Sequence, residues 1–106
     1  MPSSQEIIDE IILRVRRAAN PERIILFGSA ATGKMTRDSD IDLLVLEYEP
    51  GNTREKSVRI RQAIGSMGYP FDIIVMATER FEESKGIIGG IAYPVNKYGK
   101  VIYEAG

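Results

Sequence analysis

The 106-residue sequence contains no cysteine and no histidine, and each absence removes a class of chemistry. Without cysteine the chain can form no disulfide, thiol nucleophile or thiolate metal site. Without histidine it can have no Ser–His–Asp triad, no histidine-ligated zinc and no histidine general base. If the chain is an enzyme, carboxylates and metal ions must therefore carry its chemistry.

A strong charge of one sign and long apolar runs are missing as well. The 14 basic and 15 acidic residues leave a net charge of −1, which gives no bulk attraction for long nucleic acid. No apolar run is long enough to span a membrane, and the N-terminus lacks the basic region of a secretion signal. We therefore expect one small domain over residues 1–106, cytoplasmic and without a membrane partner.

The spacing of apolar residues predicts an α/β fold in which helices cover at least one face of a sheet. Three predicted helices begin at residues that can cap them: Ser3 or Ser4 for the first, Asn52 or Thr53 for the second and Thr78 for the third. Gly68 is expected to end the second of these helices. The predicted elements, in chain order, are a helix over 4–19, a strand over 23–28, a short helix or turn over 30–35, a strand over 40–47, a helix over 53–67, a strand over 71–76, a helix over 78–85, a broken helix over 87–98 and an extended segment over 100–104.

The most informative pattern is a Gly-Ser pair followed, after ten residues, by two aspartates. Asp40 and Asp42 open a predicted strand, and side chains two apart on a strand point to one face, so both can converge on one hard cation such as Mg²⁺. Gly28 lacks a Cβ and lets an anionic ligand approach the backbone, while the Ser29 hydroxyl and nearby N–H groups can donate to it. Phosphate-binding donors beside paired carboxylates are what a metal–nucleotide complex needs.

A third carboxylate, Asp72, stands at the start of the strand predicted over 71–76. Three acids held close together repel one another, so we expect at least one of them to have a raised pKa when no metal is bound. A structural interpretation stays open, because Asp72 could be an ordinary acid beside a turn and the Gly-Ser pair a simple turn.

The segment from Gly28 to Met35 also approaches the P-loop pattern G-x-x-x-x-G-K-[ST]. Met35 stands where a P-loop has the Ser or Thr that holds Mg²⁺, and the chain turns polar over 36–39 instead of continuing as a long helix. Phosphoryl transfer by a P-loop is therefore the less favoured hypothesis. Lys34 is a candidate phosphate contact under either hypothesis.

The Gly-Ser pair, the two aspartates and the apolar residues around them resemble the signature of the minimal nucleotidyltransferases, within the DNA polymerase beta superfamily. The resemblance implies the nucleotidyltransferase fold, a small mixed sheet flanked by helices. By position it implies that Gly28 and Ser29 bind the nucleotide phosphates. It also implies that Asp40, Asp42 and Asp72 are the catalytic, metal-ligating carboxylates.

The same resemblance implies ATP as substrate, two Mg²⁺ ions as cofactors and a HEPN-domain toxin as partner. The chain would then be the antitoxin, a protein adenylyltransferase that moves AMP from ATP to a tyrosine of the toxin. Family members often carry basic residues where this chain has Ala30 and Thr32, and Lys34 could replace them.

Two alternatives remain open at this point. The chain could be a non-catalytic antitoxin that neutralises a partner by binding alone, or it could transfer a nucleotide to a small molecule such as an aminoglycoside. Clustered carboxylates argue against the first, because a pure scaffold gains nothing from them. The acceptor hydroxyl could be presented by another protein or within an oligomer of the chain.

Overall fold

The computed structural model describes residues 3–32 and 39–106, and in these residues four strands form one mixed sheet. The strand order is β3-β2-β1-β4, with β1 antiparallel to both of its neighbours and β2 parallel to β3. The strands are β1 Arg23–Phe27, β2 Ile41–Glu47, β3 Phe71–Ala77 and β4 Lys100–Glu104. The predicted α/β class and the small mixed sheet are confirmed.

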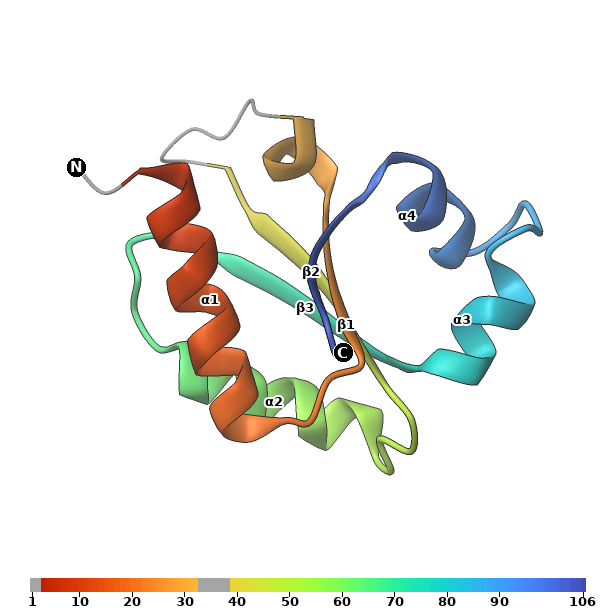
Figure 1. Ribbon diagram of the computed structural model, residues 1–106, viewed down its shortest axis with the longest axis horizontal. Helices are drawn as coiled ribbons and strands as arrows, with labels where there is room; N and C mark the ends of the chain where they lie inside the picture. Colours follow the sequence, from red (N-terminus) through yellow and green to blue (C-terminus); the bar gives the residue numbers. More distant parts are fainter. Residues whose placement is uncertain (1–2, 33–38) are drawn as a thin grey trace.

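Helices cover both faces of this sheet, as Figure 1 shows, with α1 and α2 on one side and α3 and α4 on the other. The strand β2 explains the arrangement, because Leu43 and Val45 pack in the larger apolar cluster with α1 and α2, while Leu44 and Leu46 pack in the smaller cluster with α3 and α4. The helices are α1 Ser4–Ala18, α2 Thr53–Ile64, α3 Thr78–Ser84 and α4 Ala92–Tyr98.

Two of the predicted helix caps are present. The Ser3 side chain accepts a hydrogen bond from the Glu6 N–H at the start of α1, and the Asn52 side chain accepts one from the Glu55 N–H at the start of α2. The third prediction is wrong, because Ala77 occupies the N-cap of α3 and Thr78 is already its first helical residue.

The predicted C-terminal ends need correction as well. Helix α2 ends at Ile64 and not near 67, and Gly65, with a φ of +61°, takes the place expected for Gly68. Gly65 is the first residue after α2 that adopts a positive φ without a Cβ penalty, so it ends the helix before Gly68 is reached. The broken helix expected over 87–98 is helical only in α4, and the extended segment after it is the edge strand β4.

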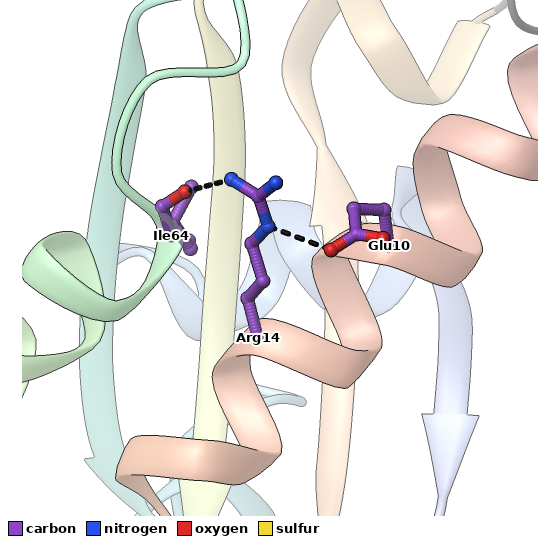
Figure 2. Close-up of polar contacts among 3 residues, drawn as sticks. All are labelled: Glu10, Arg14 and Ile64. Atoms are coloured by element: carbon purple, nitrogen blue, oxygen red, sulfur yellow. Dashed lines mark hydrogen bonds and ion pairs between the residues drawn. The ribbon is translucent and has the colours of Figure 1, made fainter.

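The two helices of the larger layer are joined by Arg14, on α1 (Figure 2). Its guanidinium donates to the Ile64 carbonyl at the C-terminus of α2 and to the Glu10 carboxylate, at 2.7 Å, on α1. The last carbonyls of a helix have no partner within the helix, so this arginine satisfies one of them while packing α1 against α2.

Replacing Arg14 by Gln is therefore expected to destabilise the fold by about 1–2 kcal/mol, since it removes a charged hydrogen bond to a helix end. Arg17→Gln, a change of the same chemistry at an exposed position of α1, should shift stability by less than about 0.5 kcal/mol. Urea unfolding of both variants measures the difference, and equal effects would show that the contact with Ile64 contributes nothing.

None of the helices within residues 3–32 and 39–106 has the length and apolar character needed to cross a membrane.

Candidate functional site

The Gly-Ser pair lies where β1 ends, and Gly28 is in direct contact with an aspartate. Its φ is +70°, and a Cβ added there would lie far inside van der Waals distance of the Asp42 Oδ2 and 3.3 Å from its Cγ. Only glycine combines this backbone conformation with such a close approach. The structure therefore brings the two halves of the sequence motif together at one point.

A short 3₁₀ turn, η1 Gly28–Thr32, leads away from β1 (Figure 1). Gly28 and Ser29 are exposed, and the Thr32 hydroxyl donates to the Ser29 carbonyl at 2.8 Å, which holds the turn closed. Thr32 thus braces the turn at a position where the resemblance suggested a basic side chain. Lys34, the predicted phosphate contact, lies outside the described residues.

The second and third carboxylates meet through the pairing of two strands. Asp42 and Asp72 are direct register partners in the parallel pair β2–β3, so both side chains leave the same face of the sheet. That face carries Leu44 and Leu46 further along β2 and is the one covered by α3 and α4. Asp42 is half-buried, whereas Asp72 is exposed.

Asp40 is exposed and lies just before β2, which begins at Ile41, so the expectation that both aspartates belong to the strand is wrong for Asp40. Its charge nevertheless acts on the Asp42 carboxylate. Burial raises the pKa of Asp42 above its ordinary value, and the charges of Asp72 and then Asp40 raise it further. The expected raised pKa is thus confirmed for the central carboxylate.

The oxygen donors at this site are of the kind that Mg²⁺ prefers, and the charges of Asp72 and Asp40 add to the effect of burial in raising the pKa of Asp42. Within the part of the chain that the structure describes, no three acidic side chains are already drawn together as a metal-binding group. Asp40, Asp42 and Asp72 therefore suit a divalent cation by the chemistry of their carboxylates and by their position at one end of β2 and β3.

Sequence reasoning missed one neighbour of the central carboxylate. Phe27, the last residue of β1, is the antiparallel register partner of Asp42 and packs against the smaller apolar cluster. Residues paired across antiparallel strands share a face, so this aromatic residue lies beside the carboxylate and contributes to its burial. The only available signal was the apolar residue directly before the Gly-Ser pair.

The raised pKa predicts how the stability of the metal-free protein depends on pH. Folded Asp42 binds its proton more tightly than unfolded Asp42, so the protonated side chain favours the folded state. The contribution of this group to the free energy of unfolding is therefore complete below the ordinary aspartate pKa of 3.8, and it is lost as the pH rises through the raised pKa of the folded state. Asp42→Asn should therefore be more stable than the wild type at neutral pH, and the gap should close as pH falls.

Melting temperatures recorded against pH in the presence of a chelator test this expectation. Asp9→Asn, at an exposed position of α1, is the control and should show no such closing gap. An Asp42→Asn variant that is less stable than the wild type at neutral pH would contradict it.

The fold has known counterparts among solved structures. A toxin–antitoxin crystallised with AMP-PNP superposes with a TM-score of 0.65 at 22% identity, over 92% of this chain and 73% of the other. A proposed nucleotidyltransferase from Sulfolobus solfataricus superposes with a TM-score of 0.61 at 20% identity, over 92% of this chain and 78% of the other. At these identities the likeness shows a shared fold.

A search of curated proteins gives no match. The sequence does match the family described as nucleotidyltransferase domain, over residues 8–93. That range holds the Gly-Ser turn and all three carboxylates. The chain therefore belongs to the nucleotidyltransferase domain family.

Proposed function

We propose that the chain is a Mg²⁺-dependent nucleotidyltransferase that moves AMP from ATP onto a hydroxyl of a partner protein. The partner we propose is a HEPN-domain toxin, modified on a tyrosine, with this chain as its antitoxin. Membership of the nucleotidyltransferase family supports the reaction class. The toxin–antitoxin neighbour that was crystallised with AMP-PNP, an ATP analogue, supports an adenine nucleotide as substrate and a toxin as partner. The HEPN domain and its tyrosine rest on the resemblance of the sequence motif.

One observation carries the proposal, the contact of the Asp42 carboxylate with Gly28 at the end of β1. This contact places a carboxylate directly beside a glycine whose exposed backbone can receive a phosphate, and the register partner Asp72 adds a second acid on the same face. A metal-bound triphosphate needs both features within a few ångströms of each other.

The roles of the residues follow from this placement. Bound Mg²⁺ would be held by Asp40, Asp42 and Asp72 and would supply charge neutralisation for the triphosphate and for the pyrophosphate that leaves. Gly28 and Ser29 bind the phosphates and orient the α-phosphorus, and Asp72 accepts the proton of the attacking hydroxyl. A new bond forms between the acceptor oxygen and the α-phosphorus, the bond to the β-phosphate oxygen breaks, and pyrophosphate departs.

Exposure of the site agrees with a macromolecular acceptor. Gly28, Ser29, Asp40 and Asp72 are all exposed, so a hydroxyl of another protein can reach the part of the site that the structure describes. Asp42 is the half-buried residue of the site, and its carboxylate contacts Gly28 while Phe27 lies beside it on β1.

The experiment is to express the chain together with the HEPN-domain protein from its own genome and to measure the partner's intact mass. The proposal predicts that the partner gains the mass of one or more AMP groups with wild-type chain, and none with Asp42→Asn. Peptide mapping should place the addition on a tyrosine. A partner that binds the chain and is neutralised without any gain in mass would overturn the enzymatic proposal.

A further inference from the structure

The C-terminal end of α4 lies near the end of β1 from which the Gly-Ser turn leaves. Strand β4 runs antiparallel to β1 with Lys100 opposite Leu26, so the residues just before Lys100 pass the residues just after Leu26. Figure 1 shows the end of α4, the start of β4 and η1 at the same end of the molecule. Tyr98, the last residue of α4, therefore lies toward the end of β1 at which Gly28 stands.

Gly99 fixes the position of that helix end. A Cβ at Gly99 would overlap the Val95 carbonyl oxygen and would lie 2.8 Å from Ile25 Cγ2 and 3.3 Å from the Leu26 carbonyl oxygen. The chain thus passes in tight contact with β1 directly after Tyr98. Contact on this scale leaves the backbone that carries the Tyr98 ring little freedom to shift.

The Tyr98 ring contacts the Lys97 ammonium but remains largely exposed to solvent. Its residue is 68% exposed, and the Lys97 ammonium lies 5.4 Å from the centre of its ring and 5.7 Å from the centre of the Tyr93 ring. A cation at this distance from an aromatic face is attracted to it, so Lys97 restrains the ring while leaving most of its surface open to solvent.

We propose that Tyr98 is a stacking surface for the base of the bound nucleotide; this rests on the proposed function. An exposed aromatic ring on a fixed backbone, near the end of β1 from which a phosphate-binding turn leaves, is placed to receive the base when the phosphates occupy Gly28 and Ser29. Stacking uses the face that every base presents, so Tyr98 adds affinity for nucleoside triphosphates as a class and does not itself distinguish adenine from guanine.

The composition of η1 is a second reason to expect a contact between the protein and the base. The five residues of η1 are glycine, serine, alanine and threonine, and three carboxylates lie close by. No residue of η1 carries a positive charge that could bind the phosphates. A contribution from the base at the other end of the nucleotide therefore adds affinity that these five residues do not supply through charge.

The test compares MgATP with Mg-tripolyphosphate, which has the phosphates but no base, by calorimetry on the full chain. Tyr98→Ala should weaken MgATP binding about tenfold and leave tripolyphosphate binding unchanged, while Tyr98→Phe should retain wild-type affinity for both. Tyr48→Ala is the matched control, because Tyr48 is 74% exposed and follows the far end of β2.

The possible outcomes separate this inference from the proposed function. Unchanged MgATP affinity in Tyr98→Ala, or an equal loss for both ligands, overturns the stacking role. A wild-type chain that binds MgATP no more tightly than tripolyphosphate overturns it too, with the proposed function left standing. A wild-type chain that binds neither ligand overturns both.

Discussion

Asp42→Asn is expected to abolish nucleotidyl transfer while the protein still folds. The change keeps the size of the side chain but removes the charge that we propose ligates the metal ion and that is coupled to both other acids. Charge stabilisation of a phosphoryl transition state by metal amounts to several kcal/mol, so activity should fall on the order of a thousandfold or more. Initial rates of AMP incorporation into the partner measure the loss.

Three measurements make this result specific. Asp9→Asn, which removes an exposed acid on α1, should transfer AMP at the wild-type rate. Circular dichroism of Asp42→Asn should match that of the wild type, and MgATP should raise the melting temperature of the wild type but not of the variant. If Asp42→Asn failed to fold, its carboxylate would be a structural group and the central assignment would be wrong.

Gly28→Ala is the second change with a large expected effect. The added methyl group would collide with Asp42 Oδ2, and alanine would also have to adopt a φ of +70°. Overlap and backbone strain together should cost about 2–5 kcal/mol of stability. Displacement of the carboxylate by about 1 Å should lower transfer by roughly a hundredfold or more.

The chain contains a matched control for the strain alone. Gly51 has nearly the same φ, +69°, but a Cβ there would meet no atom within 4 Å. Gly51→Ala should therefore cost about 1 kcal/mol through its backbone and leave transfer unchanged. Similar losses of stability and activity in the two variants would show that contact between Gly28 and Asp42 has no special role.

Local patterns in the sequence predict those features of the fold that depend on neighbouring residues. The near-continuous apolar run of β2 indicates burial on both faces, and the structure divides it between the two clusters. The Ser3 and Asn52 caps are likewise set by residues within one helical turn. The Gly-Ser pair and the acids identified the end of the sheet where the candidate site lies.

Features that depend on distant residues could not be predicted in this way. Periodicity does not tell which strands pair, so the register of Asp42 with Asp72 and the addition of β4 beside β1 emerge only in the folded chain. The buried Glu47 is another example, because it accepts a hydrogen bond from the Asn20 N–H at 2.6 Å and pairs with Lys56 at 3.3 Å. Its position in the sequence suggests only the end of a strand.

The contact between Gly28 and Asp42 is only partly predictable from the sequence. The glycine itself signals that something approaches the backbone closely, but the sequence does not say what. The fold identifies the approaching group as the carboxylate of the same motif.

The most direct test of the account is to follow the label from ATP carrying radioactive phosphorus at either the α or the γ position. The chain and Mg²⁺ are incubated with an extract of the native host in which the partner is confirmed to be present. The account predicts α-label on another protein with wild-type chain and none with Asp42→Asn. Label from the γ position alone would show phosphoryl transfer, and no label from either position would show a protein that acts by binding; each result would contradict the account.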